Sequence, residues 1–275
     1  MNAMTRWIAL ALTGALLAAT PAPGGSGVSD AAAALDAIAE RYWQRELRFD
    51  YSLREQVGLP VETIRPITFE NAQEDARFGE SVLDALAAVD EQQLDHDHWL
   101  TFRTLKYLAH GQAASAKYYW LAQQATPYAG GSQIGTLVAT FASFRFESAD
   151  DAKRYESLLE QYAAFVASLR ELLIGQHARG VVLPQVEIDA TQAVYQGYAQ
   201  PAQSDALVPA ESRLQGLAPA DRTALRETAS RTVARRLCRR SRRSRSTFEV
   251  PIEPARRKAS GFPNIPAAPT TTAIS

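Results

Sequence analysis

Cysteine is almost absent from this sequence, which limits the chemistry that its side chains can support. Cys238 is the only cysteine among 275 residues, so no disulfide can form within the chain and a zinc site made of several cysteines is excluded. The sequence also contains neither a His-Glu-x-x-His motif nor a Gly-x-Ser-x-Gly turn, which mark common zinc peptidases and serine hydrolases. We therefore predict no catalytic residue, no cofactor-binding residue and no metal ligand in this chain.

Long apolar runs are also scarce, and the one near the N-terminus is too short to cross a membrane. Trp7–Ala19 spans 13 residues, whereas a membrane-spanning helix needs about 20. A positive charge at Arg6 precedes this run, and small residues follow it up to Ala22, as in a secretory signal peptide. We predict a signal peptide at 1–22, cleaved near Ala19 or Ala22, with a buried N-terminal helix as the alternative. The remaining chain would be periplasmic or secreted, without a membrane span.

Strand patterns are missing from the rest of the sequence. We find no alternation of apolar and polar residues followed by a hairpin turn and no βαβ rhythm, whereas apolar residues recur at steps of three and four. A Gly/Ser-rich linker at 23–30 therefore leads into a predicted all-α region at 31–236, made of packed helical hairpins and layers. The predicted helices are 31–49, 70–89, 94–109, 113–124, 150–179, 186–198 and 219–236, and the predicted loop after the fourth of them is 126–132.

The longest predicted helix, at 150–179, carries signals at both ends. Ser148 or Asp150 can cap its first turn, and Gly180 fits its C-terminal stop. Pro184 prevents its continuation. Between these ends, Tyr, Leu, Phe and Val residues form a continuous apolar stripe, which predicts a helix buried along one face.

Only four histidines occur, and two of them stand close together in the segment Asp95-His96-Asp97-His98. On a helix, residues two apart point in different directions, whereas on a loop they could chelate a metal ion. The sequence offers no third ligand for this pair. We therefore interpret the segment as the exposed start of a helix, with a metal site as the alternative.

Aromatic residues gather in one short stretch, Tyr118, Tyr119 and Trp120. These side chains could line a groove that binds a peptide or a sugar. Aromatic residues at helical spacing are more often part of a hydrophobic core. The sequence leaves both interpretations open.

Positive charge is concentrated at the C-terminal end of the sequence. Residues 238–275 contain eight Arg and Lys against two Glu, a net charge of +6, so residues 1–237 carry −7. Such an arginine run can bind nucleic acid or anionic lipid, but an exported protein rarely meets nucleic acid. We expect no nucleic-acid partner, and we predict that 237–275 is an aberrant, disordered basic tail.

Three stretches of the helical region resemble a known bacterial family: Tyr42–Pro60, Phe144–Leu159 and Leu172–Pro184. The first is an aromatic helix leading to a Gly-Leu-Pro turn, the second is a Phe-rich turn before a long Tyr-Leu helix, and the third is a helix that stops at a glycine. Together they resemble the N-terminal part of the domain-of-unknown-function-885 family over residues 31–236. That family consists of mostly exported helical proteins and is related to helical zinc metallopeptidases.

The resemblance implies an intact relative that is a zinc-dependent hydrolase acting on peptides. Its zinc ligands would lie further along the chain, in a helix of the type His-Glu-x-x-Pro-Gly-His. No residue of this sequence matches that helix. The resemblance therefore implies that this chain holds no zinc and is inactive by itself.

The tail offers a reason why the later segment is missing. Gly261–Pro266 resembles the family's next segment, which continues Gly-Gly-x-x-Tyr-Tyr, but here Ala267–Ser275 follows. Codons for this ending, read one base earlier, can encode Gly-Gly and then Tyr-Tyr, and the same shift after Leu237 can restore an ordinary helix. We hypothesise that the reading frame slips near Leu237, recovers before Lys258 and slips again after Pro266, leaving the chain truncated.

Two functions from different classes therefore stand side by side. In the first, the chain is the N-terminal helical fragment of an exported zinc metallopeptidase-like hydrolase and is inactive alone. In the alternative, it is an exported, non-enzymatic helical binding or scaffold protein that uses the aromatic stretch. A third hypothesis, binding of nucleic acid or membrane by the tail, would show as a steep dependence of binding on salt.

Overall fold

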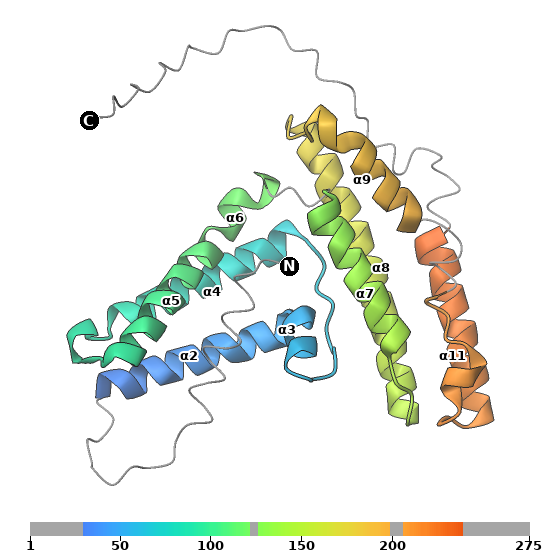
Figure 1. The fold of residues 1–275 in the computed structure, drawn as a ribbon, viewed down its shortest axis with the longest axis horizontal. Helices are drawn as coiled ribbons and strands as arrows, with labels where there is room; N and C mark the ends of the chain where they lie inside the picture. Colours follow the sequence, from blue (N-terminus) through green and yellow to red (C-terminus); the bar gives the residue numbers. More distant parts are fainter. Residues whose placement is uncertain (1–29, 122–125, 199–205, 239–275) are drawn as a thin grey trace, which may run out of the picture.

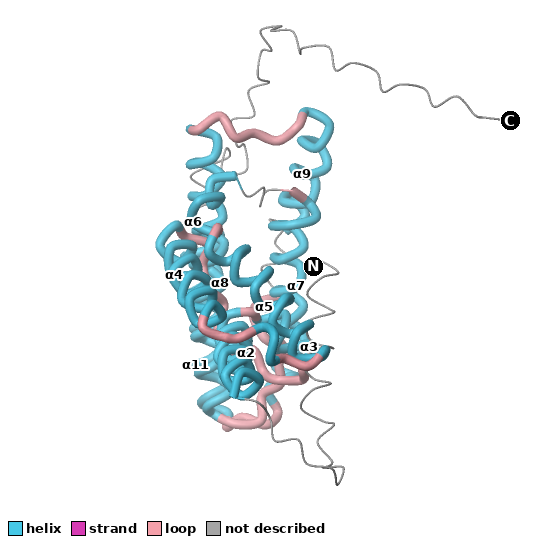
Figure 2. Tube along the Cα trace, turned by 90° about the vertical axis from the view of Figure 1, so that its left-hand side faces the viewer, coloured by secondary structure: helices cyan, strands magenta, loops and turns pink. Residues whose placement is uncertain are grey.

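The computed structural model describes residues 30–121, 126–198 and 206–238, and within these ranges it contains helices and no strand (Figures 1 and 2). The predicted all-α fold is therefore confirmed for this part of the chain. The first helical part consists of α2 (Asp30–Phe49), α3 (Tyr51–Gln56), α4 (Phe69–Ala87), η1 (Glu91–Gln93), α5 (His96–Ala113), α6 (Ser115–Tyr118) and η2 (Tyr119–Leu121). The second part consists of η3 (Pro127–Gly131), α7 (Ser132–Ser143), α8 (Ala149–Ala178), α9 (Gln185–Tyr198), η4 (Glu211–Leu214), α11 (Pro219–Thr232) and η5 (Val233–Cys238).

The core of the first part lies among three helices, because α2 packs against a hairpin made of α4 and α5 (Figure 1). Each helix contributes apolar side chains at helical spacing. Leu35 comes from α2, Val82 and Leu86 come from α4, and Phe102 and Leu105 come from α5, and all five are buried together. This cluster accounts for the apolar stripes that the sequence shows between residues 31 and 109.

The α4–α5 hairpin is unusually close at Gly79. A Cβ atom at this position would lie 2.7 Å from the carbonyl oxygen of Ala109 and 2.9 Å from the carbonyl carbon of Gln112. Both are backbone atoms of α5, so they cannot rotate out of the way. Glycine at this position therefore lets the two helix backbones approach each other directly.

The second part is built around α8, the longest helix described. Its buried face carries Tyr155, Leu158 and Leu159, which pack with Phe141 of α7 and Leu225 of α11. The Tyr155 hydroxyl donates a hydrogen bond to the carbonyl oxygen of Leu207 at 2.9 Å. Burial raises the pKa of the Tyr155 hydroxyl, so this group stays protonated and keeps donating its hydrogen bond.

The segment 57–68, between α3 and α4, attaches the first part to α8 of the second part. It begins with a turn at Val57 and Gly58 and then continues without regular secondary structure. Its side chains Val61 and Ile64 are buried in the core of the second part. The Ile64 N–H donates to Gln161 Oε1 and the Ile67 N–H donates to Ser168 Oγ, each at 2.8 Å. Polar side chains of α8 thus replace the hydrogen bonds that a helix or sheet would give to this buried backbone.

The predicted ends of the longest helix are confirmed. The Ser148 hydroxyl accepts a hydrogen bond from the Asp151 N–H, and the Asp151 carboxylate accepts one from the Ser148 N–H, which together form a capping box. Gly180 follows the helix with φ of +73°. That left-handed conformation favours glycine and ends the helix.

The predicted loop at 126–132 is wrong. Residues Pro127–Gly131 form a π-helical turn, η3, which runs directly into α7. Thr126 caps this turn by accepting a hydrogen bond from the Ala129 N–H at 3.1 Å, and Pro127 occupies a first-turn position that needs no N–H. Gly131 is required for packing, because a Cβ there would lie 2.8 Å from Val194 Cγ1 of α9.

Three other features differ from the sequence prediction. The helices α3 and α7 are additional, and the described part of the predicted helix 113–124 is divided into the short α6 and the 3₁₀ turn η2. At Tyr119 the helix tightens into a 3₁₀ turn, which has three residues per turn in place of 3.6. The remaining predicted helices are present, with ends shifted by a few residues.

Several predicted features lie outside the described residues. These are the signal peptide at 1–22, nearly all of the linker at 23–30, and the basic tail after Cys238. Among the helices that are described, none combines the length and apolar character that crossing a bilayer requires.

The close approach at Gly79 generates a prediction with a matched control. We expect Gly79→Ala to lower the free energy of unfolding by about 1–3 kcal/mol, because the new methyl group meets backbone atoms of α5. Gly111 lies within α5 with no atom near its Cβ position, so Gly111→Ala should raise stability by about 0.5–1 kcal/mol. Urea unfolding monitored by circular dichroism measures both, and two changes of the same sign would contradict the prediction.

Candidate functional site

The predicted groove residues lie where α6 and η2 meet the second helical part, and each has a different environment. Tyr119 is buried against Ala72 of α4 and Leu172 of α8, and its hydroxyl donates to the Ile67 carbonyl oxygen at 3.3 Å. Tyr118 keeps 51 % of its surface exposed. The two adjacent tyrosines therefore cannot both line one groove.

Trp120 lies at the contact between the two helical parts. Its half-buried indole ring lies against α8 at Gly175, where a Cβ atom would overlap the ring. The Arg179 guanidinium lies 3.7 Å from the centre of the indole ring, close enough for a cation–π interaction. Phe69 of α4 stacks near it at 6.4 Å, and Tyr119 meets it edge-on at 4.8 Å.

The aromatic stretch is thus divided between core and surface. Tyr119 belongs to the core, Trp120 to the contact between the two parts, and only Tyr118, with Leu121 beside it, presents a large exposed apolar surface. Sequence reasoning missed Phe69 and Arg179, because residues so far apart along the chain carry no signal of contact. The exposed pair is the part of this stretch that could meet a ligand.

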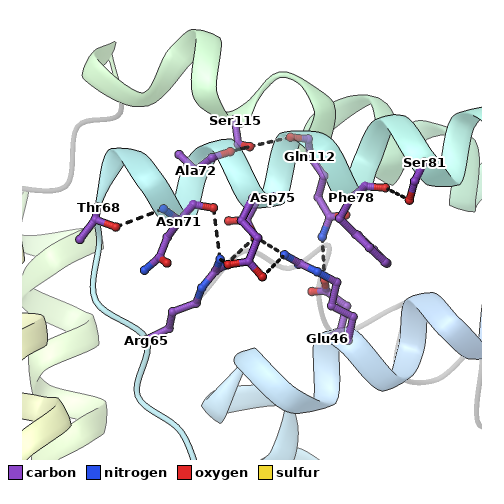
Figure 3. A network of polar contacts seen from close by, with 12 residues as sticks. Glu46, Arg65, Thr68, Asn71, Ala72, Asp75, Phe78, Ser81, Gln112 and Ser115 are labelled. Carbon is purple, nitrogen blue, oxygen red and sulfur yellow. Dashed lines mark hydrogen bonds and ion pairs between the residues drawn. The ribbon is translucent and has the colours of Figure 1, made fainter.

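A second cluster consists of charged residues between α2, α4 and the segment 57–68 (Figure 3). Asp75 Oδ1 accepts hydrogen bonds from Arg45 at 2.7 Å and from Arg65 at 2.5 Å. Arg65 also pairs with Glu74 at 2.8 Å. Both guanidinium groups lie over the Phe49 ring, at 5.1 and 4.6 Å from its centre. Two arginines and two carboxylates are thus paired with one another, and they connect α2, α4 and the segment 57–68.

Glu46 adjoins this charged cluster and faces α5. Its carboxylate accepts a hydrogen bond from Gln112 Nε2 at 2.7 Å, while Gln112 Oε1 is buried and has no hydrogen-bond partner. Figure 3 shows the two side chains meeting end to end. The pKa of the Glu46 carboxyl is raised by burial and by the negative charge of Asp50.

The Asp95–His98 segment forms the start of α5, as the sequence interpretation expects. The Asp95 carboxylate caps the helix by accepting a hydrogen bond from the His98 N–H at 2.9 Å, and it also contacts His98 Nδ1 at 2.8 Å. These hydrogen bonds lower the pKa of the Asp95 carboxyl. His96 instead stacks on Trp99. In the described ranges, no group of three or more His, Cys, Asp or Glu is arranged to hold a metal ion.

Comparison with known proteins finds one family. The model of the family described as "Bacterial protein of unknown function (DUF885)" matches residues 53–270. The chain belongs to this family. No curated protein and no solved structure matches the chain.

The DUF885 match is a single range that includes the arginine-rich stretch. It begins at Leu53 in α3, includes the whole of the second helical part, and extends through Gly261–Pro266. The segment 57–68 and the contact of Trp120 with α8 thus both lie in the part of the chain that matches the family.

In this DUF885 chain, replacing Trp120 or Tyr118 by alanine should change the free energy of unfolding by different amounts. We expect Trp120→Ala to lower the free energy of unfolding by about 3 kcal/mol, because it removes a half-buried ring from the contact between the parts. Tyr118→Ala should change stability by no more than about 0.5 kcal/mol, because the side chain is largely exposed. Urea unfolding of the two variants checks this, and equal losses would refute the division between core and surface.

Proposed function

We propose that this chain is the N-terminal helical region of an exported zinc metallopeptidase-like hydrolase. In the intact relative, a metal held by a later segment would polarise a carbonyl group and activate a water molecule, and peptides would be the substrates. The helices of this chain would form a wall beside that centre. The chain would hold no zinc and would be inactive alone.

The observation that carries this proposal is membership of the DUF885 family over residues 53–270. A structural role for the described helices fits the way their charges are used. Asp75 and Glu74, the acidic groups of the densest charged cluster, are bound by Arg45 and Arg65. Carboxylates held in this way position helices and are not free to act as a general base.

We also propose that the arginine-rich stretch arises from a slip in the reading frame near Leu237. What supports this is Gly261–Pro266, which resembles the family's next segment and falls within the matched range 53–270. On this proposal, the arginines and Cys238 were not selected for binding. Resequencing the gene from codon 230 onward tests this. A corrected frame that goes on to encode a His-Glu-x-x-Pro-Gly-His segment supports the slip and defines the frame-repaired gene, whereas a confirmed arginine-rich frame and stop contradict it.

The zinc content and peptidase activity of two proteins then test the proposal. The present chain should bind far less than one zinc per molecule and hydrolyse no peptide, whereas the protein from the frame-repaired gene should bind zinc and hydrolyse peptides. Metal analysis after dialysis and a fluorogenic peptide assay are the measurements. One tightly bound zinc per molecule of the present chain would overturn the proposal.

The alternative is a non-enzymatic binding or scaffold protein, and the exposed Tyr118 and Leu121 favour it. Tyr118 is 51 % and Leu121 58 % exposed, beside the Trp120 contact.

If this surface binds peptides, Tyr118→Ala should abolish saturable binding of an aromatic peptide, measured by calorimetry. Tyr107→Ala is the matched control, since Tyr107 is 61 % exposed on α5. Equal loss in both variants, or no binding by the unchanged chain, would remove this alternative. Trp120→Ala would not separate the two functions, because it also weakens the fold.

A further inference from the structure

The side-chain amide of Gln112, between α2 and α5, has a hydrogen-bond partner for its nitrogen and none for its oxygen. Gln112 Nε2 donates to Glu46 Oε1 at 2.7 Å, but Gln112 Oε1 is buried and accepts no hydrogen bond. An ionised carboxylate has only acceptor oxygens, so it cannot donate to the Gln112 oxygen. Rotating the Gln112 amide by 180° would place its oxygen against the Glu46 carboxylate oxygen, and the two acceptors would repel each other. A buried acceptor without a donor is unfavourable.

We propose that Glu46 and Gln112 form a proton-dependent clasp between α2 and α5. A proton bound at Glu46 Oε2 would be donated to Gln112 Oε1, while Gln112 Nε2 continues to donate to Glu46 Oε1. A carboxylic acid and a primary amide have complementary donors and acceptors, so this pair closes with two hydrogen bonds. The proton comes from solvent, and no other bond is formed or broken.

Burial is the main cause that raises the pKa of the Glu46 carboxyl, and the negative charges of Asp50 and Asp75 add to it. The charge of Arg45 and the hydrogen bond from Gln112 lower this pKa, and the net shift is upward. Arg45 is engaged by Asp75 at 2.7 Å, which weakens its effect on Glu46. Tyr42, the other titratable neighbour on α2, has its pKa raised by burial and is uncharged. On α5 the facing group is the neutral amide of Gln112.

The sign of the pH effect follows from the direction of the shift. The pKa of Glu46 is higher in the folded chain than its ordinary value of 4.5, so the folded state binds this proton more tightly than the unfolded state. Its contribution to stability is therefore present at pH values below 4.5 and is lost as pH rises through the folded pKa. The clasp holds α2 to α5 more firmly in acid.

Glu46→Gln tests the clasp, because glutamine is a permanent mimic of the protonated acid. Its amide can donate to Gln112 Oε1 at every pH. We expect the melting temperature of Glu46→Gln to exceed that of the unchanged chain by about 2–4 °C at pH 8 and to equal it below pH 4.5. The matched control is Glu80→Gln on the exposed face of α4, for which the difference should not vary with pH.

Two results would overturn the proposal. One is a Glu46→Gln protein that is no more stable than the unchanged chain at pH 8. The other is a carboxyl titration of Glu46, followed by carbon NMR, with its midpoint at or below 4.5; this measurement does not depend on any variant folding.

A double-mutant cycle separates the clasp from a simple effect of burial. The cycle uses Glu46→Ala and Gln112→Ala and measures their coupling at pH 4 and pH 8. The clasp predicts stronger coupling at pH 4, below the ordinary pKa of 4.5, because both hydrogen bonds are formed when Glu46 is protonated. Burial alone leaves a single hydrogen bond, which is stronger when the carboxylate is charged, so stronger coupling at pH 8 would also overturn the proposal.

Discussion

The arrangement of this molecule depends on the hydrogen bonding of one buried, extended stretch of backbone. The segment 57–68 inserts Val61 and Ile64 into the core of the second helical part, and buried N–H groups without partners would make that insertion unfavourable. Gln161 and Ser168 of α8 provide the partners. These polar residues interrupt the apolar character of α8 on the side that receives the segment. The orientation of the two parts follows from this attachment.

A second contact, between Trp120 and α8, depends on the first. With the segment fixed along α8, the end of α6 is brought to Gly175, where the indole ring needs the space that a missing side chain leaves. Arg179 then covers the ring at 3.7 Å. Packing within the fold thus accounts for Tyr119 and Trp120. Within this stretch, only Tyr118 and Leu121 are exposed enough to contact a ligand.

The sequence predicted the features that are determined locally. Ser148 and Gly180 bound the longest helix through contacts with their own neighbours, so both ends of that helix could be predicted. The turn at 127–131 could not, because its glycine serves the approach of Val194 from α9, and nothing nearby in the sequence indicates that contact. The same limit applies to the candidate site. The aromatic stretch could be recognised, but the directions of its side chains depend on the 3₁₀ turn at Tyr119 and on distant Phe69 and Arg179.

The attachment along α8 also sets a register. Ile64 and Ile67 are three residues apart on an extended chain, which advances by about 3.3 Å per residue, so their N–H groups lie about 10 Å apart. Gln161 and Ser168 are seven residues apart on a helix, which advances by about 1.5 Å per residue, or about 10.5 Å in all. The two spacings coincide in the observed alignment. A slip of the segment by one residue would move both N–H groups by about 3.3 Å and separate both from Gln161 and Ser168 at once, so the two hydrogen bonds together favour a single alignment.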